Sequence, residues 1–378
     1  MRTRAQVLAY RIHAQQLDRQ PSSPRGLTDA AIFDFGVQDT GRDGASWALA
    51  NRGVPVAGAE ELEASEEVAL AWTLRGSPHF YRRSELFDAF VATSPWSEAD
   101  AAKRVLAADK TLKAAGIPAH AGLAQIAAKM RTVVTRPMVK GEVSTKLTAV
   151  LDEPYLKYCV PCGVVHAPEQ AFRLSALYAG LELQPGTSPP VLKRVPGWPR
   201  RTPGPAADPL SAPRHLHPIR NYLRFLGPAR PADVAGFLET SVNEVKAHWP
   251  EDAVPVKIAG TERWWLGGDE PDPDSGLVRL LGGFDLLLQG RDRDLLVPDK
   301  SRHKPLWPTL GRPGAVLVGT DIAGTWRPKT AGKRFTLRLD LWDKVRARSR
   351  EALEQQAERL AQHRGLQLAT IDEAWASA

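Results

Sequence analysis

The chain has 378 residues, 43% of them hydrophobic and 25% charged, which excludes a wholly disordered protein and suits two to four folded domains. Its formal net charge of +7 favours a polyanionic partner, most simply nucleic acid. No apolar run approaches the roughly 18 residues that a membrane helix needs, and two cysteines are too few for a disulfide framework, so we expect a cytoplasmic protein with no membrane contact.

The first expected unit covers residues 1–92. Apolar residues recur at helical spacing from Val7 to Leu17, and the arginines of this helix, Arg11 among them, are expected on its exposed surface. A second short helix, a polar Gln-Asp-Thr turn and a third helix from about Gly44 to Asn51 follow. Two apolar runs separated by Gly76-Ser77 then predict a β-hairpin. Three helices closed by a hairpin are the pattern of a winged helix.

The same order of elements recurs twice further along the chain. Residues 93–183 hold three helical stretches and a closing segment that is partly hairpin-like. Residues 216–270 read as a helix, a helix-turn-helix and a hairpin with Gly260-Thr261 at its tip. Between these two winged-helix units, nine prolines and several basic residues predict an extended linker over residues 184–215, either a solvated spacer or a strap against phosphates.

The last part of the chain, residues 271–378, has β-patterned runs separated by glycine-rich turns, followed by a helix from about Asp343 to His363. The sequence therefore predicts an α+β protein. Three tandem winged-helix units precede a small β-rich C-terminal domain with a terminal helix.

The two cysteines lie close together, and a histidine follows them. Cys159, Cys162 and His166 are three residue types that bind zinc, but a structural zinc site usually takes four ligands at fixed spacing. We therefore expect no metal here, and a tight turn with both thiols packed inside.

Several common catalytic motifs do not occur in the sequence. It has no G-x-x-x-x-G-K-[ST] phosphate loop, no G-x-G-x-x-G dinucleotide loop, no H-E-x-x-H zinc motif and no G-x-S-x-G nucleophile elbow. We expect neither a nucleotide nor another cofactor.

Several short motifs occur in an order that resembles the bacterial winged-helix DNA glycosylases of the AlkZ and YcaQ type. They are "TRAQVLAYRIHAQQL", "WTLRGSPHFYRR", "FRLSALYAGLEL", "GGFDLLLQGRDRDLLVP" and "GTWRPK", and together they extend over nearly the whole chain. The resemblance implies an enzyme that excises bulky N-alkylated purines or unhooks interstrand crosslinks.

In that family the catalytic motif follows the second helix and has the form Gln, apolar, Gln or Asp. The corresponding triplet here is Gly36-Val37-Gln38, so the first polar position is a glycine. The resemblance makes Gln38 the residue that orients a water, and Asp39 the residue that polarises it and faces the sugar cation. If the backbone is extended, however, these neighbours point in opposite directions and only one can act. Asp39 has a structural alternative, in which it caps the helix that begins near Asp43.

Some basic residues lie near predicted loops, and others flank the presumed recognition helix of the unit of residues 93–183. They are candidate DNA contacts, because exposed cations suit phosphate binding. The candidates are Arg75, His79, Arg82, Arg83, Lys140, Lys146, Arg291 and Arg293. For His79 the alternative is a histidine packed in a strand beside Phe80 and Tyr81.

Two functions remain open from the sequence. The first is a monofunctional DNA glycosylase that acts, as a monomer, on double-stranded DNA carrying N7-alkylated purines or crosslinks, in DNA repair or in self-resistance to a DNA-alkylating natural product. The second is a non-catalytic winged-helix protein that regulates transcription or sequesters lesions. Base release from alkylated DNA distinguishes the two.

Overall fold

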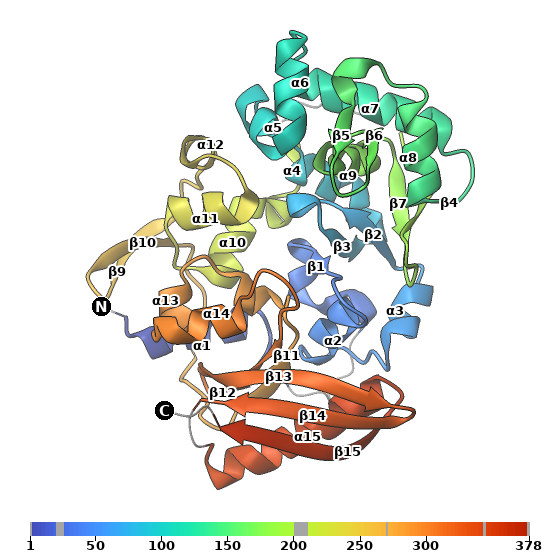
Figure 1. Ribbon diagram of the computed structural model, residues 1–378. Coiled ribbons are helices and arrows are strands. Elements are labelled where there is room, and N and C mark those ends of the chain that lie inside the picture. Colours follow the sequence, from blue (N-terminus) through green and yellow to red (C-terminus); the bar gives the residue numbers. More distant parts are fainter. Residues whose placement is uncertain (1, 20–25, 200–210, 270, 343–344, 376–378) are drawn as a thin grey trace.

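The computed structural model describes residues 2–19, 26–199, 211–269, 271–342 and 345–375. Figure 1 shows the second winged-helix unit at one end of the molecule and the C-terminal sheet at the other, with the first and third units between them. The structure confirms the predicted mixture of helices and sheets.

The first unit contains helices α1 (Arg4–Ala14), α2 (Gly44–Ala50), α3 (Ala59–Ala64) and α4 (Leu86–Thr93) and strands β1 (Val37–Gln38), β2 (Val68–Trp72) and β3 (Pro78–Arg82). Helix α1 begins with a capping box. The Thr3 hydroxyl accepts from the backbone N–H of Gln6, and the Gln6 side-chain oxygen accepts from the backbone N–H of Thr3. The predicted hairpin is confirmed as β2 and β3. Two short 3-10 turns, Leu27–Asp29 and Ala31–Asp34, replace the expected second helix.

The first and second units share one six-stranded sheet, which the sequence did not predict. Its order is β1-β3-β2-β7-β8-β4, with β7 at Leu181–Gln184, β8 at Val191–Arg194 and β4 at Met138–Val139. Leu70 of β2 pairs with Leu183 of β7 across the two units. The predicted linker of residues 184–215 is therefore wrong at its start, because β8 is a paired strand in that range. Residues 200–210 of this segment lie outside the described residues.

The second unit is built on helices, confirming the expected helical stretches. They are α5 (Glu98–Arg104), α6 (Asp109–Ala114), α7 (Ala119–Val133), α8 (Lys140–Thr148) and α9 (Glu169–Tyr178). The hairpin-like segment is a short pair of strands, β5 (Lys157–Cys159) and β6 (Val164–His166). Cys162 is exposed and Cys159 only half-buried, so the expectation that both thiols are packed inside is wrong.

The third unit agrees closely with its sequence pattern. It consists of α10 (Pro218–Leu226), α11 (Pro231–Leu238), α12 (Val242–Ala247), β9 (Val254–Ile258) and β10 (Thr261–Trp265). The Ser241 side chain caps α12 by accepting from the backbone of Glu244. Ile258 pairs with Thr261 at the end of the hairpin, so its turn is formed by Ala259 and Gly260.

The C-terminal domain is a five-stranded sheet, β11-β12-β13-β14-β15, with helix α15 (Ala347–His363) beside it. The strands are β11 (Val278–Leu281), β12 (Gly314–Val318), β13 (Asp321–Ala331), β14 (Arg334–Leu341) and β15 (Gln367–Trp375). Helix α15 is not terminal as predicted, because β15 follows it and pairs in parallel with β14. In the described part of the chain, no helix is both long and apolar enough to cross a membrane.

Buried ion pairs join the first unit to the chain that surrounds the C-terminal sheet. Arg52 follows α2 and forms hydrogen bonds of 2.8 and 2.9 Å with the two carboxylate oxygens of Asp285. Arg11 of α1 binds Asp292 at 2.6 Å and is only 1% exposed, so its expected place on the surface is wrong. Removing one member of such a pair leaves a buried charge at a cost of about 3–5 kcal/mol. These contacts therefore fix the first unit against the segment between β11 and β12.

Candidate functional site

The polar turn after the first helix places Gln38 at the end of the short strand β1. Gln38 lies opposite His79 of β3, and Val37 lies opposite Phe80. Gly36 precedes the strand with φ of +84°, and a Cβ atom there would lie 2.6 Å from the Tyr81 ring. The glycine at the first polar position of the motif thus meets two needs of the fold, the left-handed backbone and the space that Tyr81 fills.

The side-chain amide of Gln38 is held in one orientation. Its Oε1 accepts a hydrogen bond of 2.9 Å from Nη2 of Arg75, and its Nε2 donates to Oγ1 of Thr40 at 2.9 Å. Because a guanidinium can only donate, the Arg75 contact identifies the oxygen end of the amide. The same Nη2 donates to Oε1 of Gln289 at 2.6 Å, and the guanidinium lies 4.2 Å from the centre of the Phe237 ring. Arg75 therefore holds Gln38 in place. The sequence had instead suggested that Arg75 is an exposed DNA contact.

A small cavity lies beside this amide. Its volume is about 20 Å³, and its polar lining comes from Gln38, Arg75, His79, Asp285 and Gln289. A polar cavity needs roughly 10–15 Å³ of such space to hold one water. Gln38 Oε1 has a second lone pair beyond the one that Arg75 uses, so the site has room and an acceptor for a single water.

Asp39 faces away from this cavity. Its backbone N–H continues the pairing with β3 by donating to Pro78 O at 2.9 Å, so the chain is still extended and successive side chains alternate. Asp39 lines a different, larger cavity of about 840 Å³, whose walls carry further carboxylates, Asp43, Glu60, Glu61 and Glu63. The prediction that only one of the two neighbours can face a given water is confirmed.

The Asp39 carboxylate instead supports the start of α2. Its Oδ1 accepts from the backbone N–H of Ala45 at 3.3 Å, as the capping alternative predicts. Asp43 occupies the cap position itself but binds Arg364 at 2.6 and 3.0 Å. Burial, followed by repulsion from Glu63 and Asp43, raises the pKa of Asp39 to about 6, against the opposing effect of the Ala45 hydrogen bond.

We expect Asp39→Asn to stabilise the protein above pH 6. The folded-state pKa of Asp39 lies above its ordinary value near 3.8, so ionisation opposes folding, and this loss of stability develops as pH rises from about 4 to about 6. Asparagine keeps an acceptor for Ala45 without the charge. The variant should exceed the wild type by about 2 kcal/mol at pH 8 and match it near pH 3.5, as measured by urea unfolding across this range. An equal difference at all pH values would contradict the shifted pKa.

Four of the predicted DNA contacts are already paired with carboxylates. Arg82 binds Asp34 at 2.6 Å and Glu85 at 2.9 Å. The remaining pairs are Arg83 with Glu182, Lys140 with Glu169, and Lys146 with Glu142. The expectation of free cations is therefore not met for these residues. Glu85 and Glu142 are near neighbours in sequence, whereas Asp34, Glu182 and Glu169 are brought near only by folding.

His79 is buried, with 2% of its surface exposed. Its Nδ1 lies 2.9 Å from Ser77 O and 3.2 Å from Thr73 Oγ1. Burial, together with the charge of Arg75, lowers its pKa to about 3, so the ring is neutral at physiological pH. The alternative of a packed strand histidine describes it, and the expected phosphate contact is wrong.

Three further arginines, Arg291, Arg293 and Arg312, form a group near Arg75. Arg291 is exposed, and Arg293 stacks 4.7 Å from the Trp307 ring centre. Burial first, and then repulsion from Arg291 and Arg312, lowers the pKa of Arg293. Burial followed by repulsion from Arg291 likewise lowers the pKa of Arg75, to about 10. Within the described residues, no carboxylate forms an ion pair with Arg291, Arg293 or Arg312, so this arginine group suits an external anion.

Sequence reasoning missed Gln289 and Arg312. Gln289 shares Arg75 with Gln38 although 251 positions separate the two glutamines, and Arg312 lies in a loop between β11 and β12. No local pattern connects them to the motif. The available signal was weaker, namely that Gln289 lies two residues before Arg291, the first of two arginines chosen as phosphate contacts.

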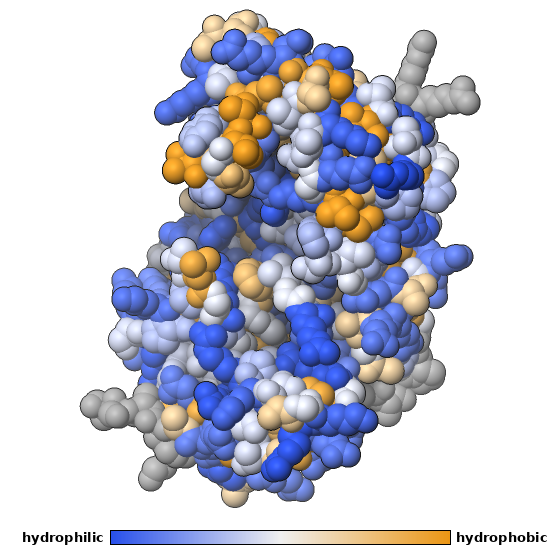
Figure 2. Space-filling model, turned by 45° about the vertical axis from the view of Figure 1, so that its right-hand side comes forward, coloured by the Kyte–Doolittle hydropathy of each residue, from blue (hydrophilic) through white to orange (hydrophobic). Residues whose placement is uncertain are grey.

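Three winged helices and an arginine group without acidic partners define a protein of the winged-helix DNA-binding class. Hydrophilic residues cover most of the face in Figure 2, which is hollowed between the upper and lower parts of the molecule. The DNA glycosylase AlkZ-like family matches residues 34–363, and the chain belongs to this family of DNA glycosylases.

A solved structure with the same architecture is the DNA glycosylase AlkZ of Streptomyces sahachiroi. The two share 18% sequence identity and superpose with a TM-score of 0.69, over 99% of this chain and 100% of the other. A search of curated proteins found no match.

Proposed function

We propose that this glycosylase hydrolyses the N-glycosidic bond of bulky N7-alkylated purines or interstrand crosslinks in double-stranded DNA, in DNA repair or in self-resistance to a DNA-alkylating natural product. The observation that carries the proposal is the water-sized cavity at Gln38, bordered by Arg75 next to the unpaired arginine group. This arrangement supports a site where water activation and phosphate binding would occur next to each other.

The chemistry asks for little acid catalysis. Alkylation at N7 makes the purine cationic, so the base leaves as a neutral molecule when the bond to C1′ breaks. The enzyme has to place a water near C1′ and to stabilise the sugar cation. Gln38 Oε1 accepts from this water through the lone pair that Arg75 leaves free, and the fixed amide spares the cost of orienting it during the reaction.

The arginine group would hold the phosphates that flank the lesion. Burial, followed by repulsion from Arg291, lowers the pKa of both Arg293 and Arg312, so a phosphate bound among these arginines would relieve repulsion as well as forming hydrogen bonds. Three winged-helix units in one chain can surround a duplex without dimerisation, which supports action as a monomer.

Arg291→Gln should weaken binding to duplex DNA and reduce its salt dependence. Each phosphate contact contributes about 0.9 to the slope of log affinity against log salt concentration, so the slope should fall by about 1. Fluorescence anisotropy at several salt concentrations measures it. Arg338→Gln, which removes the same charge from an exposed position on β14, is the matched control and should leave the slope unchanged. Equal slopes for both variants would show that Arg291 meets no phosphate.

The base-release assay tests the function itself. Wild-type protein is incubated with a duplex that carries one N7-methylguanine, and separately with a duplex carrying a bulky azinomycin-type N7 adduct or crosslink. Free modified base and abasic sites are then quantified by mass spectrometry and alkaline cleavage. We expect release from the bulky substrates. Tight duplex binding with no release from any alkylated substrate would contradict hydrolysis and favour the non-catalytic function.

A further inference from the structure

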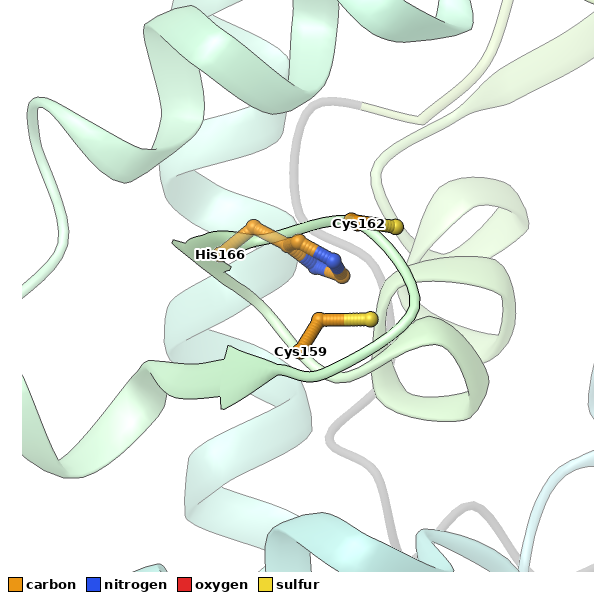
Figure 3. Close-up of side chains that lie close together, drawn as sticks. All are labelled: Cys159, Cys162 and His166. Atoms are coloured by element: carbon orange, nitrogen blue, oxygen red, sulfur yellow. The ribbon is translucent and has the colours of Figure 1, made fainter.

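The β5–β6 hairpin of the second unit brings together three side chains that bind soft metal ions. Cys159 ends β5, Cys162 lies in the turn and His166 ends β6. Their ligand atoms all lie within 4.8 Å of one another. Figure 3 shows the three side chains extending to the same side of the hairpin. For comparison, two sulfur ligands of one tetrahedral zinc ion lie roughly 3.8 Å apart, given Zn–S bonds of about 2.3 Å.

The turn between the cysteines is built to present both thiols together. The backbone N–H groups of Cys162 and Gly163 both donate to the carbonyl oxygen of Cys159, at 3.2 and 2.9 Å. Gly163 follows with φ of +68°, a conformation that a glycine adopts without strain. The chain therefore reverses within four residues, and the second cysteine returns to the side of the first.

The histidine has the proton arrangement of a metal ligand. Nδ1 of His166 lies 2.7 Å from the carbonyl oxygen of Ala167, and because a carbonyl oxygen only accepts, Nδ1 carries the proton. This leaves the Nε2 lone pair directed at the Cys159 thiol, where a metal would replace the proton that the two side chains share. A backbone carbonyl that holds the other ring nitrogen is the usual support behind a histidine ligand.

The hairpin has limited support of its own, although β6 packs against α8. Its two strands have three residues each, and isolated short hairpins are marginal in water. Apolar side chains on it point to solvent instead of into a core, with Tyr158 58% exposed, Val160 80% and Val164 55%. A crosslink at its tip would supply the stability that packing does not.

We propose that this hairpin binds one zinc ion through Sγ of Cys159, Sγ of Cys162 and Nε2 of His166. Both thiols release their protons to solvent as the two Zn–S bonds form. Water completes the tetrahedral set, because Cys162 is exposed and leaves the fourth direction open. Two thiolates and an imidazole favour zinc over magnesium or calcium, which take oxygen ligands. The site is separate from the Gln38 cavity and supports the second winged helix.

Cobalt substitution tests this site directly. The full chain, reduced and freed of metal by a chelator, is titrated with Co²⁺ under anaerobic conditions. We expect a near-ultraviolet thiolate-to-cobalt charge-transfer band that saturates at one Co²⁺ per chain and disappears when an equivalent of Zn²⁺ is added. The chain has only two cysteines, both in this hairpin, so the band has no other source. Wild-type protein without such a band overturns the proposal, independently of any result on base release.

Variants then assign the ligands. Cys162→Ser should lose the band, and His166→Ala should need a much higher Co²⁺ concentration to reach half-saturation. His215→Ala is the control, because His215 belongs to a second group with Asp34 and Glu85 that contains no sulfur. It should titrate like the wild type. If His166→Ala also titrates like the wild type, the histidine is not a ligand and the three-ligand site is wrong. Circular dichroism of each variant confirms that it is folded.

Discussion

Replacing Gln38 by alanine is expected to slow base release roughly 100- to 1000-fold, the range found when one preorganised hydrogen-bonding side chain is removed from an active site. The substitution removes the acceptor beside the water-sized cavity, while Arg75 keeps its hydrogen bonds to Gln289 and to the Phe237 carbonyl. Single-turnover rates on the duplex with the bulky N7 adduct measure the effect. Duplex affinity should change little, because the arginine group that we propose to bind the phosphates is untouched.

Two further variants make the Gln38 result specific. Gln38→Glu keeps carboxylate oxygens facing Arg75, so it should retain more activity than alanine. Gln355→Ala, an exposed glutamine on α15, should release base at the wild-type rate. If Gln38→Ala also released base at the wild-type rate, water orientation by this amide would be ruled out, whatever the substrate.

Restoring glutamine at the first polar position of the motif, with Gly36→Gln, is expected to destabilise the protein by about 2–5 kcal/mol. A side chain at φ of +84° costs roughly 1–2 kcal/mol. Its Cβ would also lie 2.6 Å from the Tyr81 ring, and overpacking of this kind costs roughly 1–3 kcal/mol. Urea unfolding measures the loss. The variant should not gain activity, because the new side chain has no space beside Gln38.

A matched glycine separates the two contributions to this loss. Gly41 has φ of +96°, but a Cβ added there meets nothing within 4 Å. Gly41→Ala should therefore show only the backbone cost, whereas Gly36→Ala should show an additional loss of roughly 1–3 kcal/mol from Tyr81. Equal losses at both positions would mean that Tyr81 moves aside freely.

The outcome for the cationic residues shows where local reasoning stops. Exposed arginines near loops were good candidates, and Arg291 fits that description. Arg82, Arg83, Lys140 and Lys146 fit it equally well in sequence yet bind carboxylates in the structure. Glu142 and Glu85 stand at helical-turn spacing from Lys146 and Arg82, but the partners of Arg83 and Lys140 come from distant parts of the chain, and the sequence around those two cations carries no record of them.

The sequence by itself determined the elements that short-range physics controls. The helix-turn-helix pattern predicted α11 and α12, and turn glycines predicted the β2–β3 and β9–β10 hairpins. The extended Gln38-Asp39 pair predicted two side chains facing apart. Only the tertiary structure decided that two units share one sheet, that Arg11 is buried, and that Arg75 holds Gln38. Arg75 is 37 residues from Gln38 and 214 from Gln289. Contacts at such separations form when whole units pack together, because hydrophobic burial stabilises the overall arrangement. The residues that this packing brings together show no periodic pattern in the sequence.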